Sequence, residues 1–476
     1  MKRTLPTCLV VPLAWLALGA GLPAQAQAQA QASKASQEDC DLQCLICPGL
    51  QDPKQYAEGV MKSMKQVAPG KDKWLFRSEV DLSNDFGIPQ DMQAEYARLL
   101  ATFAAKGIRV AFAVQPTRGL MHRDKVLPEN RHGFDYATAS RNLERFLGQL
   151  RRGGALVPDI MPLVRTPPEA EFFFRRDHHW TPSGSQATAQ LVAAEIKRQP
   201  WYAELTKKSY RTEPGVMLPK DGTMNRAMTK ICGNNYGTQY VRGFQTVPAG
   251  DGADALFEDE APAEVVLVGT SNSAARDDEM KNYNFEGYLK EYLSVDILNF
   301  ALPGAGQEGA LLQYLQSDSY KPEAPPKLII WELPASYRLE TPLLYRQLIP
   351  AINGGCAKSP RVLAGNRLER PALVTGQRVE LLSNSGPQRQ TLTGQRGFLD
   401  IKLSDKSLKD FYIITYYDNG ARDKAWFRRE AIIDGGQFYL ELNTAAEFRD
   451  ANLMSVFLEP VQPLDKPITM DVKLCM

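Results

Sequence analysis

Residues 263–273, with the sequence AEVVLVGTSNS, join an apolar run to a turn that carries two serines. The run Val265–Val268 contains no polar residue, which is typical of a strand buried on both faces of a parallel sheet. Functional sites collect at the carboxyl ends of such strands, and acyl-transfer enzymes hold their nucleophile on a sharp turn after a core strand. We therefore interpret Ser271 as the candidate nucleophile and Ser273, in the same turn, as the weaker alternative.

Strand-like and helix-like patterns alternate from about residue 56 to residue 350. We expect strands at 73–77, 108–114, 155–160, 264–268, 295–300 and 327–331, and helices at 92–106, 137–152, 183–198, 284–292 and 306–315. Alternation of this kind predicts a mostly parallel sheet covered on both faces by helices.

A base for the serine is found in FFFRRDHHW, residues 172–180, which holds two of the four histidines of the chain. If the backbone turns between Asp177 and His179, the carboxylate takes the Nδ1 proton of the imidazole and leaves Nε2 free as a base. His178 offers an alternative, a metal site with its two neighbours, but we expect adjacent side chains to diverge and further ligands are not evident. We predict no metal and no cofactor, with His178 packing or hydrogen-bonding locally.

The N-terminus has the features of a secretory signal peptide. Lys2 and Arg3 precede an apolar run from Leu9 to Leu22, and an alanine- and glutamine-rich stretch follows up to Ala32. We assign residues 1–32 to this signal segment, in which cleavage after Ala26, Ala28, Ala30 or Ala32 is possible, and we expect the mature protein to be exported. The net charge of +1 argues against a nucleic-acid partner.

Six cysteines follow the signal segment, and export makes disulfides possible. They are Cys40, Cys44, Cys47, Cys232, Cys356 and Cys475. A bridge from Cys356 to Cys475 would close the C-terminal segment at its two ends. Cys232 would then pair with one of the three N-terminal cysteines, of which Cys47 is favoured. A zinc site in that N-terminal cluster is the alternative, which the lack of a nearby histidine disfavours. The sequence leaves the pairing of Cys40 and Cys44 open.

The pattern changes after residue 350, so we expect one domain over residues 33–350 and a second over 351–476. Short β-prone runs separated by turn residues predict a β-sandwich or barrel in the second. These runs are 367–374, 378–382, 390–392, 397–403, 411–417, 436–442 and 453–458.

Basic and aromatic residues are interspersed in this second region. Trp426, Lys424, Arg428 and Arg396 suit a sugar polymer that bears carboxylates, because aromatic rings stack on sugars and guanidinium groups pair with carboxylates. The alternative is a set of core aromatics with a solvated charged rim. Tyr337 and Arg338, which follow the strand expected at 327–331, either line a substrate groove or cap the fold.

Several of these motifs resemble a known family. Asp177-His178-His179-Trp180 is similar to the Asp-x-His-Trp motif of the SGNH-hydrolase-like acetyltransferases of alginate biosynthesis, in which the Asp-His pair precedes the serine. Lys73–Phe76, Asn284–Leu289 and Trp331–Pro334 are also similar, and the match covers essentially the whole mature chain. The C-terminal region resembles a carbohydrate-binding module that some relatives lack. The Gly-Thr-Ser turn departs from the Gly-Asp-Ser of ordinary SGNH enzymes, and no Gly-Asn-Asp block is evident, which leaves the oxyanion hole undefined.

The resemblance implies a circularly permuted, SGNH-hydrolase-like parallel-sheet domain followed by a β-sandwich carbohydrate-binding module. It implies a periplasmic O-acetyltransferase that acts on mannuronate hydroxyls of alginate. Ser271 would carry the acetyl group, His179 would act as base and Asp177 would orient it. The implied partners are alginate (polymannuronate), an acetyl donor and other alginate biosynthesis and export proteins. The same triad with water as acceptor would make a carbohydrate acetylesterase, and a polymer-binding scaffold is a third alternative.

Overall fold

The computed structural model describes residues 46–249, 262–276, 278–387, 389, 391, 396–433 and 435–476. The expected signal peptide, Cys40 and Cys44 lie outside these residues. So do residues 390 and 392 of the strand expected at 390–392. Residues 49–476 form one compact unit that contains two hydrophobic cores.

The first core surrounds a four-stranded parallel sheet with the strand order β3-β8-β6-β7. The strands are β3 (Arg109–Gln115), β8 (Leu328–Pro334), β6 (Val265–Val268) and β7 (Leu298–Asn299). Every residue of β6 is buried, as its apolar sequence predicted. Because the strands are parallel, the ends of β6 and β8 reach the same edge of the sheet, which brings the serine turn beside residue 332.

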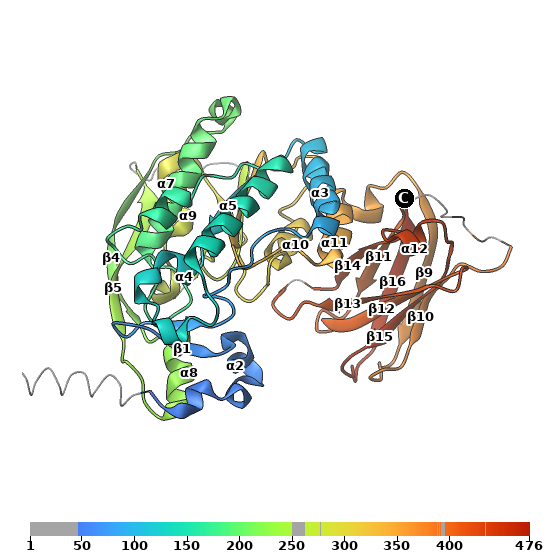
Figure 1. The fold of residues 1–476 in the computed structure, drawn as a ribbon. Helices are drawn as coiled ribbons and strands as arrows, with labels where there is room; N and C mark the ends of the chain where they lie inside the picture. The colour runs from blue at the N-terminus through green and yellow to red at the C-terminus, as the bar shows by residue number, and fades with distance from the viewer. Residues whose placement is uncertain are drawn as a thin grey trace, which may run out of the picture. The chain divides into compact units, whose positions relative to one another are not determined.

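The helices around this sheet begin and end within a few residues of their expected positions. They are α3 (Gln93–Ala105), α5 (Tyr136–Arg152), α7 (Pro182–Lys197), α9 (Phe285–Leu293) and α10 (Gly309–Leu315). Helices α3 and α7 both contact β3, and α7 packs against α9 (Figure 1). Six further α-helices among the described residues were not predicted: α2 (Gly59–Met64), α4 (Arg118–Met121), α6 (Met161–Arg165), α8 (Thr223–Cys232), α11 (Pro342–Ile352) and α12 (Ala446–Arg449).

Three strand predictions need correction. The run at 73–77 forms β2 (Leu75–Arg77), which pairs antiparallel with β1 (Val67–Pro69), outside the parallel sheet. The run at 155–160 contributes a single bridge, between Leu156 and Ala111. The run at 295–300 is a strand only over the two residues of β7. Each of these segments is apolar because it packs in the core, and burial alone does not require ladder pairing.

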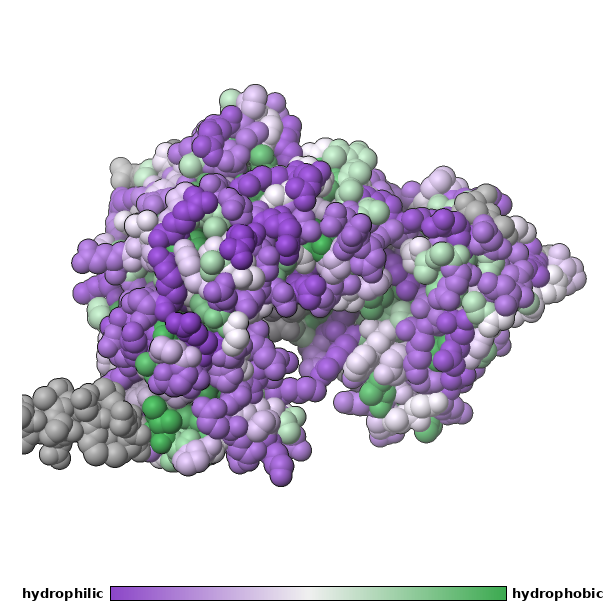
Figure 2. Space-filling model, viewed as in Figure 1, coloured by the Kyte–Doolittle hydropathy of each residue, from purple (hydrophilic) through white to green (hydrophobic). Residues whose placement is uncertain are grey.

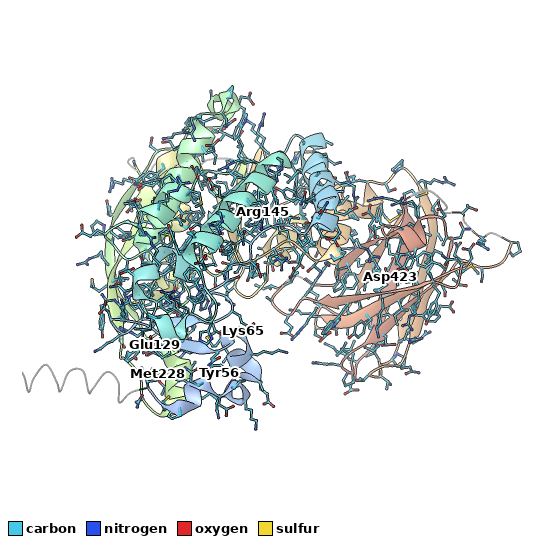
Figure 3. The ribbon with its side chains drawn as sticks, in the orientation of Figure 1. Tyr56, Lys65, Glu129, Arg145, Met228 and Asp423 are labelled. Carbon is cyan, nitrogen blue, oxygen red and sulfur yellow. A yellow bond between two sulfur atoms is a disulfide. The ribbon has the colours of Figure 1, made fainter. Side chains whose placement is uncertain are left out.

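A long antiparallel hairpin was not predicted at all. Strands β4 (Tyr210–Lys220) and β5 (Gln239–Pro248) pair with each other, and α8 (Thr223–Cys232) lies between them in the sequence. Most of their residues are exposed or half-buried, so the sequence lacks the apolar alternation that marks a strand. Helix α8 lies beside β1 and α2 (Gly59–Met64), where Figure 3 labels Met228 of α8.

The second core lies in a sandwich of two four-stranded antiparallel sheets, which confirms the expected all-β architecture. The strand orders are β10-β15-β12-β13 and β14-β11-β16-β9. The strands are β9 (Val362–Arg370), β10 (Val379–Ser383), β11 (Phe398–Leu403), β12 (Asp410–Tyr417), β13 (Arg422–Arg428), β14 (Gln437–Glu441), β15 (Leu453–Pro460) and β16 (Ile468–Cys475). Strands β13 and β16 were not predicted.

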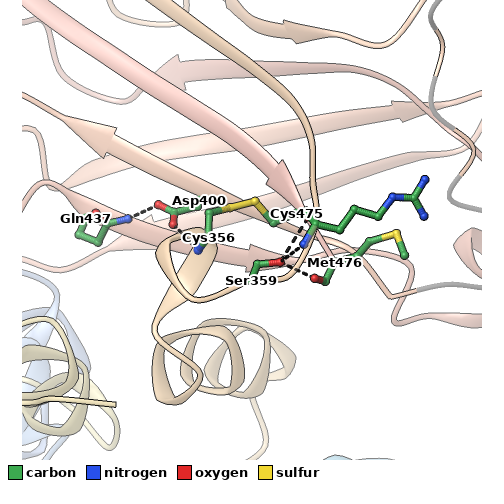
Figure 4. Close-up of a disulfide and its surroundings, with 7 residues drawn as sticks. Cys356, Ser359, Asp400, Gln437, Cys475 and Met476 are labelled. Carbon is green, nitrogen blue, oxygen red and sulfur yellow. Dashed lines mark hydrogen bonds between the residues drawn. A yellow bond between two sulfur atoms is a disulfide. The ribbon is translucent and has the colours of Figure 1, made fainter. Parts of the chain in front are cut away.

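A disulfide joins Cys356 to Cys475, 119 residues apart in sequence (Figure 4). The backbone N–H of Cys356 also donates to the carboxylate of Asp400 on β11, at 2.8 Å. The bridge therefore fixes both ends of the sandwich segment. Cys47 and Cys232 are each disulfide-bonded as well.

Helix α11 connects the two cores. Its Arg346 pairs at 2.6 Å with Asp423 of β13, the residue that Figure 3 labels, and its Gln347 accepts hydrogen bonds from the buried Arg429. Arg429 is 8% exposed, and this burial lowers its pKa to about 9. Arg429 thus has a structural role, unlike the exposed basic residues of β13.

The face of the molecule in Figure 2 is mostly hydrophilic, with scattered hydrophobic areas. Within the described residues, no helix combines the length and the apolar character that crossing a membrane requires.

Candidate active site

Asp177, His179 and Ser271 form one hydrogen-bonded chain, although 92 residues separate the histidine from the serine. The His179 Nε2 and Ser271 Oγ atoms are 2.8 Å apart. On the other side of the ring, Nδ1 contacts Oδ1 of Asp177, and the His179 backbone N–H donates to the same oxygen at 3.0 Å. This is the order of contacts that a nucleophile, a base and an orienting carboxylate require.

The loop that carries Asp177 and His179 folds back on itself. Phe173 and Trp180 form an antiparallel bridge, and the Phe174 N–H donates to the His179 carbonyl at 3.2 Å. The aromatic residues of the loop are buried on the core side, which explains the run of phenylalanines. The turn between them presents Asp177 and His179 together at the sheet edge.

A buried arginine holds this loop in place. Arg118 is 1% exposed, and its guanidinium donates to the carbonyls of Phe174 and Asp177 at 2.5 and 2.6 Å. It also donates to the carbonyl of Leu75 on β2 at 2.6 Å, and its Nε lies 3.2 Å from the carboxylate of Asp81. Burial lowers the pKa of Arg118 to about 10, and Asp81 opposes this shift, so the group keeps its charge at neutral pH.

Asp177 is fully buried and is held as an anion. Its Oδ2 accepts the backbone N–H of Thr223 at the start of α8 at 2.8 Å, and Lys220 Nζ lies 3.6 Å from its Oδ1. Burial is the largest single influence and opposes ionisation, but His179 and Lys220 outweigh it, so the pKa of Asp177 lies well below its usual range. Burial also lowers the pKa of His179 in spite of Asp177, which keeps this imidazole neutral, as a general base must be.

Glu332, the fifth residue of β8, holds the serine turn in place through hydrogen bonds. One oxygen of this fully buried carboxylate accepts the Thr270 N–H at 2.6 Å and the hydroxyls of Thr270 and Ser273 at 2.8 and 3.0 Å. A side chain on Gly269 would lie 2.7 Å from that oxygen, which explains the glycine. Burial raises the pKa of Glu332 to about 6.

The two segments of the site are also tied directly to each other. The Trp180 indole N–H donates to the Asn272 carbonyl at 2.9 Å, and the Trp180 backbone N–H donates to the Asn272 side chain at 3.2 Å. Trp180 therefore has a structural role, in agreement with the full burial of its ring. Ser273 is 4% exposed and directs its hydroxyl to Glu332, so His179 is paired with Ser271 and not with the alternative nucleophile.

The adjacent imidazoles of His178 and His179 do not diverge as expected. Their ring centroids are 3.9 Å apart, and His178 Nδ1 hydrogen-bonds the Thr223 hydroxyl at 2.8 Å. With Asp177 they form a cluster whose potential metal-ligand atoms lie within 4.8 Å of one another. In each of these three residues, one potential ligand atom already makes a hydrogen bond to another side chain. His178 has the local packing and hydrogen-bonding role that the sequence predicted.

Three of the candidate binding residues share one surface of the sandwich. Lys424, Trp426 and Arg428 alternate with buried residues along β13, so their side chains point outward together; we call them the Trp426 surface. Trp426 is 45% exposed and stacks on Tyr412 of β12 with ring centroids 5.5 Å apart. Lys424 lies over the Tyr412 ring and pairs with Glu459 at 2.8 Å.

The other three candidates lie elsewhere. Arg396 is exposed and contacts Glu95 of α3 at 3.3 Å. Arg338 is exposed and lies 3.5 Å from Glu340, whereas Tyr337 is half-buried, and burial raises its pKa. None of the three belongs to the Trp426 surface.

Sequence reasoning missed the residues that support the triad. Glu332 could have been noticed in the sequence, because an acidic residue within the apolar segment of β8 is itself unusual. Arg118, Lys220 and Thr223 belong to segments without apolar periodicity, and only the fold brings them to Asp177.

Comparisons with known proteins agree with this architecture. Residues 67–335 match the family described as "SGNH hydrolase-like domain, acetyltransferase AlgX", and residues 355–476 match a "C-terminal carbohydrate-binding module". The chain is 33% identical to the alginate biosynthesis protein AlgX of Pseudomonas fluorescens, over 98% of this chain and 94% of that protein. It is 31% identical to the probable alginate O-acetylase AlgJ of Pseudomonas putida, over 57% of this chain and 70% of that protein.

The solved structure of Pseudomonas aeruginosa AlgX is also similar. It superposes with a TM-score of 0.78 at 31% identity and covers 91% of this chain and all of that one. The chain therefore belongs to the AlgX family of alginate biosynthesis proteins, with an SGNH-hydrolase-like domain on a parallel sheet and a C-terminal carbohydrate-binding module of antiparallel strands.

Proposed function

We propose that this protein is a periplasmic O-acetyltransferase that transfers acetyl groups to mannuronate hydroxyls of alginate. The observation that carries the proposal is the 2.8 Å contact between His179 Nε2 and Ser271 Oγ, with Nδ1 of the same ring on a buried carboxylate. Residues 33–350 would form the catalytic domain and residues 351–476 the polymer-binding one. The names of the relatives support alginate as the polymer.

The reaction proceeds in two balanced steps. Ser271 Oγ attacks the acetyl carbonyl of a donor while its proton passes to His179 Nε2, and the donor's leaving group departs with that proton. A sugar hydroxyl then gives its proton to His179 and attacks the acetyl-serine, which releases the O-acetyl sugar and restores the Ser271 hydroxyl. Asp177 stabilises the imidazolium in both steps. The Ser271 backbone N–H is the natural donor to the oxyanion of each tetrahedral intermediate.

The Trp426 surface would hold the polymer. An exposed indole between Lys424 and Arg428 combines a stacking face for a sugar ring with cations for its carboxylate. Exposed charge pairs contribute little individually, so we expect this surface to give modest affinity per sugar and to act through many sugars at once.

The test incubates the mature protein with an activated acetyl ester and short mannuronate oligomers, followed by mass spectrometry of the sugars. Acetylated oligomers from the native protein, absent with Ser271→Ala, His179→Ala and Asp177→Ala, are the expected result. Free acetate without acetylated sugar would identify an esterase instead. Polymer binding without any reaction, unchanged by the three substitutions, would identify a scaffold.

A further inference from the structure

A small pocket lies at the carboxyl ends of β3 and β8, and His178, the neighbour of His179, is part of its lining. Its polar lining consists of Arg77, Asp81, Gln115, Thr117, Arg118, His178 and Ser336, with apolar walls from neighbouring residues. The cavity volume is about 30 Å³, enough for roughly two water-sized groups. A carboxylate has two oxygens of this size.

Two buried hydrogen-bond donors in this pocket have no partner among the described residues. Gln115 is 5% exposed, and its Oε1 accepts from Asn272 at 3.3 Å, which leaves its Nε2 unpaired. Thr117 is 7% exposed, and its hydroxyl is unpaired too. Buried polar groups are almost always hydrogen-bonded, so two unpaired donors in one pocket point to an acceptor that binds there.

The charges of the pocket favour an anion. Asp81 is the one carboxylate in the described lining, and two guanidiniums neutralise it: Arg77 contacts its Oδ1 at 2.7 Å and Arg118 contacts its Oδ2 at 3.2 Å. Two cations against one anion leave a net positive charge. His178 adds none, because burial holds its pKa well below the usual range.

Two residues of the pocket lining contact residues of the reaction site. The ring of His178 lies against that of His179, with centroids 3.9 Å apart, and Gln115 is hydrogen-bonded to Asn272, the residue that follows Ser271. An acceptor sugar whose hydroxyl faces His179 therefore has its other substituents within reach of this pocket.

We propose that this pocket binds the carboxylate of the acceptor uronate and so positions the sugar for acetylation. Gln115 Nε2, the Thr117 hydroxyl and Arg77 are the donors. This assignment rests on the proposed transferase function and adds to it a residue-level basis for choosing uronates over neutral sugars.

The test compares two acceptors with the native protein: mannuronate trimers, and the same trimers with their carboxylates reduced to primary alcohols. Loss of even one charge-assisted hydrogen bond predicts a KM about tenfold higher for the reduced trimer. Thr117→Val and Gln115→Glu should raise the KM for mannuronate and bring the ratio of the two KM values toward one. Thr102→Val, which removes a hydroxyl that bonds the Arg98 carbonyl in α3, is the matched control and should keep the native ratio.

The variants separate this pocket from the Trp426 surface, for which we also propose carboxylate binding. Equal KM values for the two acceptors with the native protein would overturn the pocket assignment and leave the transferase intact, even if neither variant folds. A native ratio that persists in both folded variants would overturn it as well. Transfer to neither acceptor would overturn the proposed function itself and this assignment with it.

Discussion

The candidate active site and the Trp426 surface use charged and aromatic residues in opposite environments. Asp177, His179 and Glu332 are at most 8% exposed, and partners from other elements fix each of them. The Trp426 surface arises from the two-residue period of a single strand, and its central residue is 45% exposed. Electrostatic interactions are far stronger when buried than when solvated. Single substitutions should therefore have large effects in the first region and small ones in the second.

The largest effect should come from the triad itself. Ser271→Ala or His179→Ala removes the nucleophile or the base, and we expect kcat for acetyl transfer to fall by about 10³-fold or more. Polymer binding, measured by affinity electrophoresis, should persist because the sandwich is untouched. Ser273→Ala is the control in the same turn, and we expect a loss of about tenfold or less. Transfer that survives in Ser271→Ala but not in Ser273→Ala would reverse the assignment.

Removing the disulfide should separate the two regions in stability. Cys356→Ser with Cys475→Ser opens a loop of 119 residues. The chain-entropy model predicts a loss of about 5 kcal/mol in the free energy of unfolding. In a urea titration, we follow the environment of Trp426 as the signal of the sandwich and acetyl-transfer activity as the signal of the triad. The Trp426 signal should change at the lower urea concentration, because the sandwich unfolds first. If both signals of the variant changed together, at the urea midpoint of the native protein, this expectation would be contradicted.

Glu332 should make stability depend on pH. Its folded-state pKa, raised to about 6, means that keeping the buried carboxylate charged costs about 2 kcal/mol at neutral pH. This group's contribution therefore improves as the pH falls from 7 to 5, because the protonated form is the one that burial favours. Glu332→Gln, still able to accept from Thr270, should abolish that part of the pH dependence in urea titrations. An identical pH dependence in both proteins would show that Glu332 does not titrate in this range.

The smallest effect should come from the Trp426 surface. Trp426→Ala removes one stacking face, so we expect about a tenfold loss of affinity for polymannuronate. Tyr240→Ala, which removes another exposed aromatic on β5, is the control and should bind normally. If both variants bind alike, the sandwich recognises the polymer elsewhere.

Burial was the feature that the sequence revealed most directly. The apolar strands β3, β6 and β8 and the amphipathic helices around them were predicted because each has one dominant environment. The hairpin of β4 and β5 was missed because its residues are mostly exposed. Strand β16 was missed although it alternates buried and half-buried residues, since polar residues interrupt its apolar ones.

The candidate site divides in the same way. Asp177, His179 and Ser271 could be named in advance because chemistry limits which residue types can form a triad. Their supports could not, since a buried arginine or glutamate is defined by the partners that the fold supplies. The pocket beside His178 is of this second kind, because it is formed by the ends of two strands that are distant in sequence.

The most direct test of the account is to trap the acyl-enzyme. The mature protein is mixed with an activated acetyl ester without acceptor, quenched, digested and mapped by mass spectrometry, and a parallel sample is chased with mannuronate oligomers before quenching. We predict one acetyl group on Ser271, which disappears in the chase as acetylated sugar appears. Acetyl on Ser273 or on a lysine that the chase leaves in place, or transfer to sugar with Ser271 never acetylated, would contradict the mechanism.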